Sequence, residues 1–166
     1  MGSITFKRVN ASYKNNPAIR NLLRYVIYEK GYVNKFRFWG ARNLSKDVEK
    51  ATREIITIQK LLGKNEGRRM HHFIISFPLE IQDVQVVYIL AEVLADYLGQ
   101  EYQLFYGVHT DKPDLHIHLV MNSVSFKTGL KWTKGKSEFI KWGDNIKRML
   151  EELLNEYYGF SKGINC

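Results

Sequence analysis

Hydrophobic residues recur at intervals of three and four in four stretches of the chain, and this spacing predicts four amphipathic helices. The stretches are residues 19–29, 45–62, 81–98 and 137–158, and they are followed by Gly31, Gly63, Gly99 and Gly159. Glycine often ends a helix because it adopts the left-handed conformation without strain. Pro17 suits the first turn of the first helix, and Ser45 is the expected N-cap of the second.

Apolar and polar residues alternate in three other stretches, which predicts strands over residues 4–9, 70–77 and 115–122. Residues 102–109 are rich in aromatic and β-favouring residues and are predicted to form a fourth strand. A short hairpin is expected over residues 123–133. The elements then follow in the order strand, helix, helix, strand, helix, strand, strand, helix. This order suits an antiparallel sheet with helices on one face, in the α+β class, and leaves the other face of the sheet open.

Length and composition favour one soluble domain that spans residues 1–166. No stretch approaches the roughly 18 apolar residues of a membrane span, and residues 1–13 lack the apolar region of a signal peptide. The single cysteine, Cys166, excludes a disulfide within the chain. We therefore expect a cytoplasmic protein with no membrane partner.

Positive charge is concentrated in the first part of the chain. Residues 1–70 hold 16 Lys and Arg against 5 Asp and Glu, whereas the remainder holds 9 against 12. A one-sided positive field is typical of nucleic-acid-binding proteins, although a membrane surface or solubility alone would favour the same composition.

Three of the five histidines lie within ten consecutive residues, at 109, 116 and 118. Alternate side chains of a strand share a face, so His116, His118 and Asn122 point one way. If the two strands form a hairpin across the loop at residues 110–114, His109 can meet His116 and His118. Three converging imidazoles with no fourth ligand predict a metal site with open coordination positions, as in catalysis. Imidazole suits zinc, copper, iron or nickel better than manganese or magnesium, so these residues leave the ion open.

In the strand at 70–77, Phe73 and Phe77 point to one face and His72 points to the other. If the phenylalanine side is core, His72 faces the histidine cluster. A purely structural role for His72 fits the pattern equally well.

Basic and aromatic residues alternate over residues 30–42, a composition that can hold phosphates and stack unpaired bases. An ordinary amphipathic strand fits the same stretch. The residues expected to contact DNA are Lys30, Lys35, Phe36, Arg37, Phe38, Trp39 and Arg42.

Taken together, RYVIYEKG at 24–31, HHFIISFP at 71–78 and HTDKPDLHIHLVMNSVSF at 109–126 resemble the HUH relaxases of mobile DNA, most closely the MobP type. The resemblance extends from residue 21 to residue 159 in the order of the family. It implies a ferredoxin-like core with an open sheet face, and a DNA strand transferase that starts conjugative mobilisation of a plasmid or integrative element. The chain departs from some relatives at 15–17, where a serine precedes the nucleophile helix in those proteins.

The resemblance also implies roles for individual residues. His109, His116 and His118 match the metal ligands, which hold Mn²⁺ or Mg²⁺ in the family, with Zn²⁺ able to bind in vitro. Tyr25 matches the nucleophilic tyrosine. The alternative nucleophiles are Tyr28 and Tyr32, and the accessory residues are Asp111, His72 and Asn122, with Asp111 expected to orient His109.

The implied reaction is the nicking of single-stranded DNA at a transfer origin, through a covalent 5′-phosphotyrosine. Accessory relaxosome and coupling proteins are the expected partners. The chain is expected to be a single relaxase domain, either the N-terminal part of a longer protein or an unusually small member of the family. Three alternatives remain: a rolling-circle replication initiator, a noncatalytic single-strand-binding module and a zinc-dependent hydrolase.

Overall fold

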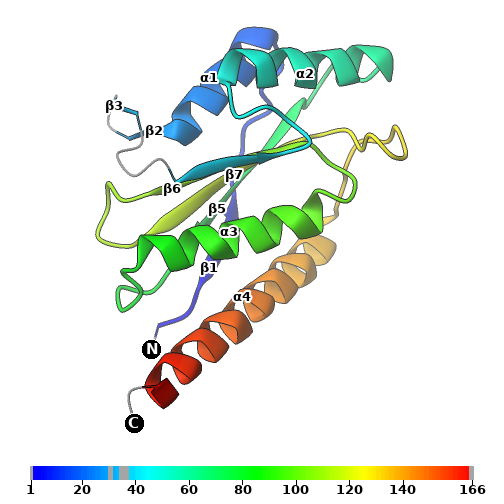
Figure 1. The fold of residues 1–166 in the computed structure, drawn as a ribbon. Coiled ribbons are helices and arrows are strands. Elements are labelled where there is room, and N and C mark those ends of the chain that lie inside the picture. Colours follow the sequence, from blue (N-terminus) through cyan, green and yellow to red (C-terminus); the bar gives the residue numbers. More distant parts are fainter. Residues whose placement is uncertain (1, 30–31, 34–37, 165–166) are drawn as a thin grey trace.

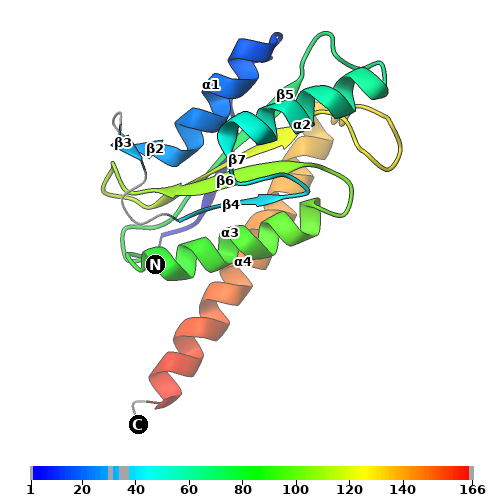
Figure 2. The ribbon, with the colours of Figure 1, turned by 45° about the horizontal axis from the view of Figure 1, so that its top comes forward.

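A five-stranded antiparallel sheet forms the centre of the computed structural model, which describes residues 2–29, 32–33 and 38–164 (Figures 1 and 2). The strand order is β1-β5-β7-β6-β4, and the antiparallel α+β class is confirmed. A separate two-stranded sheet pairs β2 with β3. The strands are β1 (Thr5–Arg8), β2 (Tyr28–Glu29), β3 (Tyr32–Val33), β4 (Trp39–Arg42), β5 (Met70–Ser76), β6 (Leu104–His109) and β7 (His116–Asn122).

The four predicted helices are present as α1 (Asn16–Ile27), α2 (Val48–Leu61), α3 (Val84–Leu98) and α4 (Lys136–Ile164). Pro17 stands in the first turn of α1, as expected. The N-cap of α2 is Asp47 rather than Ser45, because the Asp47 side chain accepts a hydrogen bond from Lys50 N while Ser45 Oγ accepts one from Asp47 N. Two short side chains therefore share the capping of this turn.

Helices cover both faces of the sheet, which corrects the expectation that they lie on one face (Figures 1 and 2). On the first face, Ile117, Leu119 and Met121 of β7 pack in the main core together with α3 and α4. On the second face, Val120 lies in a smaller core with residues of α1 and α2. Apolar side chains on this second face need burial, and α1 supplies it while it crosses the sheet beside the histidines.

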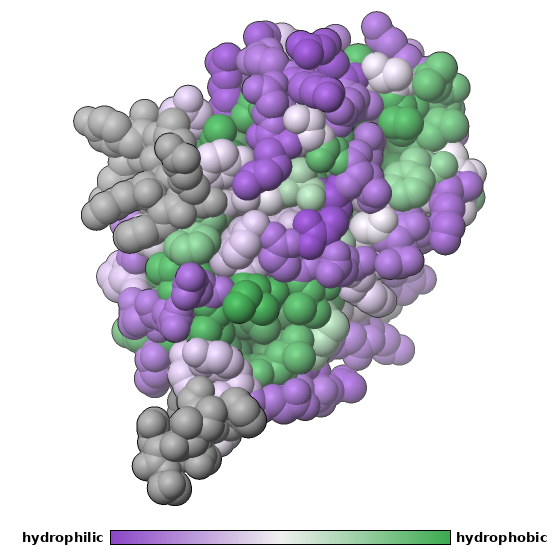
Figure 3. Space-filling model, in the orientation of Figure 1, coloured by the Kyte–Doolittle hydropathy of each residue, from purple (hydrophilic) through white to green (hydrophobic). Residues whose placement is uncertain are grey.

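The expected hairpin at 123–133 is reduced to an isolated bridge between Val124 and Lys131. Within the described ranges, no helix combines the length and apolar character needed to cross a bilayer. Hydrophobic residues reach the surface over α3 and the adjoining part of α4, where Ile89 and Tyr97 of α3 are exposed (Figure 3).

Candidate metal and tyrosine site

Three buried imidazoles converge on the second face of the sheet, at the end of β6 and the start of β7. His109 pairs directly with His116 in the ladder, and Gly107 pairs with His118. One nitrogen from each of the three histidines lies within 4.8 Å of the corresponding nitrogens of the other two. The convergence expected from the hairpin is therefore observed, while metal binding itself stays a prediction.

Each imidazole of this triad is oriented by a contact through one of its ring nitrogens. His109 Nε2 lies 2.8 Å from the carbonyl oxygen of Val26, and His116 Nδ1 lies 3.1 Å from that of Asp114. A carbonyl oxygen only accepts, so these two nitrogens carry the protons. In this tautomer the second nitrogen of each ring carries the lone pair with which a neutral imidazole binds a metal. For His116 this second nitrogen is Nε2, which lies 3.3 Å from Asp111 Oδ1.

The third ring, His118, is held through another histidine. His118 Nδ1 lies 2.8 Å from His72 Nε2, and His72 Nδ1 lies 3.2 Å from the hydroxyl of Tyr13. His118 Nε2 is buried and has no hydrogen-bond partner in the part of the chain that the structure describes. A buried polar atom without a partner is costly, and a bound cation would satisfy it.

The electrostatic environment keeps His118 and His72 neutral. Burial, and after it the neighbouring His109, His72 and His116, lowers the pKa of His118 to about 2. Burial likewise lowers the pKa of His72 to about 4. A neutral imidazole is the form that binds a metal.

These residues fit a divalent ion with open coordination positions. An ion about 2.1 Å from each nitrogen requires the three nitrogens to lie about 3–4 Å apart, so only a small closure of the observed arrangement is needed. Three protein ligands leave further positions for water or substrate.

Tyr25 projects from α1 over this triad. Its ring centroid lies 5.0 Å from that of His118, 5.6 Å from His109 and 6.0 Å from His72. The side chain is half exposed, at 50%. Burial, and then the charge of Asp111, raises the pKa of the Tyr25 phenol, so the hydroxyl is protonated at neutral pH. A phenol in this position is accessible to a substrate that is itself held at the triad.

The two alternative nucleophiles lie further along the chain. Tyr28 is the C-cap of α1, and its side chain is partly exposed beside Tyr25. Within the described ranges, the ring of Tyr25 contacts the imidazoles of His109 and His118, whereas the ring of Tyr28 does not. Tyr32 lies in β3, and its side chain is outside the described part.

Two accessory residues have roles that differ from the prediction. Asp111 Oδ1 lies 3.3 Å from Nε2 of His116, so it approaches His116 rather than the expected His109. Val26 O occupies the position beside His109 that was predicted for Asp111. Asp111 therefore remains in direct contact with the triad, through His116.

Asn122 belongs to a buried network away from the triad. Its side-chain oxygen accepts hydrogen bonds from Gln59 Nε2 and Val124 N, and its nitrogen donates to Gln103 Oε1. Gln59 in turn accepts a hydrogen bond from Arg69, whose Nη1 donates to Asn16 at the start of α1. The network therefore fixes α1 and α2 to the sheet and replaces the expected accessory role of Asn122 with a structural one.

Tyr13 is a site residue that sequence reasoning missed. It lies in the polar segment before α1, and its hydroxyl contacts His72. Its backbone φ of 52° is in the left-handed region, which is rare for a tyrosine and often marks functional sites. The only local signal in the sequence is an aromatic residue in an otherwise polar connection.

The predicted DNA-contact segment is only partly described. Lys30, Lys35, Phe36 and Arg37 lie outside the described residues. Phe38 packs against Tyr88, and Trp39 is half-buried under Lys46.

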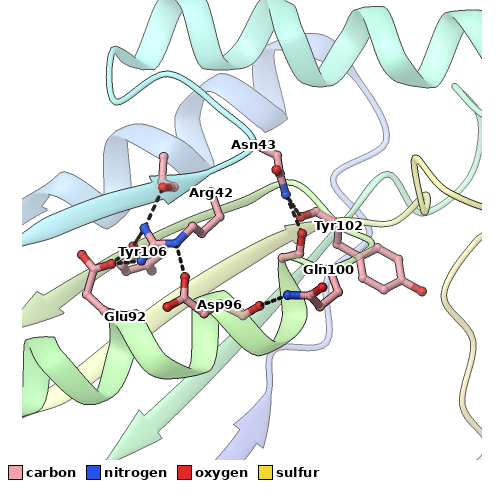
Figure 4. A network of polar contacts seen from close by, with 9 residues as sticks. Arg42, Asn43, Glu92, Asp96, Gln100, Tyr102 and Tyr106 are labelled. Atoms are coloured by element: carbon pink, nitrogen blue, oxygen red, sulfur yellow. Dashed lines mark hydrogen bonds and ion pairs between the residues drawn. The ribbon is translucent and has the colours of Figure 1, made fainter.

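Arg42 forms ion pairs with two carboxylates of α3 (Figure 4). Its Nε lies 2.6 Å from Asp96 Oδ1, its Nη2 pairs with Glu92, and its Nη1 donates to the hydroxyl of Tyr106. Its charge is balanced within the protein. Its position therefore does not support the predicted DNA contact.

Comparison with known proteins places these features in a family context. The model of the relaxase family described as MobA/VirD2-like, nuclease domain, matches residues 5–158. A Staphylococcus aureus protein named Protein rlx is 35% identical over 109 residues, which cover 63% of this chain and 34% of that protein. A second Protein rlx of the same species is 33% identical over 114 residues, which cover 68% of this chain and 34% of the relative.

The chain spans about a third of the length of these curated relatives. A solved structure described as the molecular basis of vancomycin resistance transfer in Staphylococcus aureus has a similar fold, with a TM-score of 0.64. The match covers 94% of each chain at 14% sequence identity, so it supports the fold alone.

Proposed function

The chain belongs to the relaxase family with the MobA/VirD2-like nuclease domain, and from this premise we propose that it nicks single-stranded DNA at a transfer origin. The nick would start conjugative mobilisation of a plasmid or an integrative element. The observation that carries the proposal is the position of Tyr25, whose ring lies within 5–6 Å of two histidines of a buried triad.

In the proposed reaction, Tyr25 Oη attacks the phosphorus of the scissile phosphodiester. A bond forms between the tyrosine oxygen and phosphorus, the bond from phosphorus to the 3′ oxygen breaks, and the 3′ oxygen leaves as a hydroxyl after it takes up a proton. The DNA stays attached as a 5′-phosphotyrosine. Attack by the free 3′-OH reverses the step and rejoins the strand, because the bond energy is kept in the phosphodiester.

The phenol must lose its proton during attack, since burial holds its pKa above the usual value. We assign the proton to Asp111, whose carboxylate lies at the triad, with Oδ1 3.3 Å from His116 Nε2. His72 is the weaker candidate, because both of its ring nitrogens are engaged, by Tyr13 and His118.

His109, His116 and His118 would hold a divalent ion, which we propose is Mn²⁺ or Mg²⁺. When bound, such an ion neutralises the negative charge that builds on the phosphate oxygens during attack. Zn²⁺ is also expected to bind in vitro, because imidazole suits it well. The roles of the protein are to orient the three imidazoles and to keep α1 over them.

The test is incubation of the chain with Mn²⁺ and single-stranded oligonucleotides spanning the transfer origin of its genetic element. We expect a covalent adduct and a shortened strand with a free 3′-OH, both abolished by EDTA and by Tyr25→Phe. Tyr28→Phe is the matched control and should retain the adduct. Binding without any adduct from the wild-type protein would instead indicate a noncatalytic single-strand-binding module.

A further inference from the structure

A pocket of about 540 Å³ adjoins Tyr25 on the side away from the end of α1. The segment after β1, the helix α1 and the strand β5 line it, with Tyr13, Leu22 and Ile74 contributing aromatic and aliphatic side chains. Tyr25 and His72 also border it, and both contact His118, so the pocket lies beside the triad. Its volume and mainly apolar lining are within the range of sites that bind small organic groups.

Asn21 stands one helical turn before Tyr25 on the same flank of α1. Asn21 and Tyr25 line both this pocket and a second pocket of about 380 Å³, so they lie between the two. Arg24 and Tyr28 line the second pocket as well. The Asn21 side chain is exposed, and its carboxamide makes no hydrogen bond within the described ranges. A carboxamide offers both a donor and an acceptor, the combination with which asparagine recognises the edge of adenine.

Two cations lie near this pocket. Lys7 pairs with the pocket residue Ile74 in the sheet, and Arg68 donates a hydrogen bond to the carbonyl of Ala11, two residues before Tyr13. Such cations can pair with phosphates of a strand that runs past the pocket. The left-handed backbone of Tyr13 costs about 1–3 kcal/mol and is held by hydrogen bonds from Arg68 and Arg69 to the carbonyls of Ala11 and Ser12.

We propose that this pocket binds the unpaired nucleobase that flanks the phosphodiester attacked by Tyr25, with Tyr13 packing against the base and Asn21 recognising its edge. The proposal rests on the proposed function, because a phosphate held between Tyr25 and the triad places the adjacent nucleotide beside α1. The pocket then selects the base at one position of the DNA and aligns the phosphate with the tyrosine.

The experiment selects bound strands from a random single-stranded DNA pool with the full chain and Mn²⁺, followed by sequencing. We expect the wild-type protein to enrich a motif, and Asn21→Ala to lose preference at one position while keeping the rest. Asn21→Asp, which can only accept hydrogen bonds, should shift that position toward cytosine, whose exposed amino group donates. Asn155→Ala, an exposed helical asparagine on α4, is the matched control and should keep the whole motif.

A second measurement uses the selected oligonucleotide with an abasic site at the affected position. The wild-type protein should bind it about 5- to 100-fold more weakly than the intact strand, and Asn21→Ala should show a smaller difference. An unchanged motif in Asn21→Ala, or an absent motif in the wild-type protein, would overturn the pocket assignment. Neither readout needs cleavage, whereas adduct formation on the same oligonucleotide tests the proposed function separately.

Discussion

Gly107 lets the tyrosine-bearing helix approach the sheet, and Gly107→Ala should therefore disturb both stability and the site. A Cβ atom at this position would lie 2.7 Å from Val26 O and 3.3 Å from Val26 Cγ1. The obstacle is backbone of α1, so the helix itself must move. The same carbonyl oxygen is the partner of His109 Nε2, and displacement would weaken the contact that orients this imidazole.

Overpacking of this kind costs about 1–3 kcal/mol, and the weakened hydrogen bond adds about 1 kcal/mol. We expect Gly107→Ala to lower the free energy of unfolding by about 2–4 kcal/mol in urea titrations. Loss of an outer contact to a metal-binding histidine typically lowers metal affinity about 10- to 100-fold, which calorimetric titration with Mn²⁺ would measure. Gly135→Ala is the matched control, because its Cβ would meet no atom within 4 Å. Identical stability and affinity in the two variants would refute the close-approach argument.

Three further predictions concern the core and the metal. Asn122→Ala leaves Gln103 Oε1 and Val124 N without these partners, so it should lower the free energy of unfolding by about 2–4 kcal/mol while Mn²⁺ affinity is retained. Burial lowers the pKa of His71 to about 3, so only the unfolded chain gains this proton as pH falls through about 6.5. Stability in urea should therefore fall from pH 7 to pH 5 by about 2 kcal/mol more in the wild-type protein than in His71→Phe. Mn²⁺ at 100 times its Kd should stabilise the protein by about 2.7 kcal/mol in thermal unfolding, and His118→Ala or EDTA should remove this effect.

Much of the site could be predicted because it depends on local patterns. Alternation in β7 determined which face carries His116 and His118, and the short loop determined that His109 would meet them. The pairing of His109 with His116 is the direct consequence. Because side chains of a strand alternate between its two faces, burial of one face determines which residues lie on the other.

The rest depends on contacts between segments that are distant in the chain. Nothing near His109 indicates that Val26 O would orient it, since the two residues are 83 positions apart. Tyr13 was missed because its contact with His72 follows from a left-handed backbone that the sequence does not mark. The sequence does not indicate that Arg42 is paired, because its carboxylate partners Glu92 and Asp96 lie 50 and 54 positions further along the chain, on α3.

The coverage of the second sheet face was also not predictable from periodicity. An amphipathic helix has an apolar flank in either arrangement, and the pattern does not say which face of the sheet receives it. The position of α1 follows from the smaller core, in which its apolar residues pack against Phe105 and Val120. That position is what brings Tyr25 over the histidines.

The central claim is that Tyr25 attacks the phosphodiester, and localisation of the covalent bond tests it most directly. Trypsin should release residues 25–30 as one peptide that contains both Tyr25 and Tyr28, and fragmentation in the mass spectrometer separates the two. After reaction with single-stranded DNA and nuclease trimming, we predict a nucleotide attached to Tyr25. Attachment to Tyr28, or to a peptide that contains Tyr13 or Tyr32, would contradict the account.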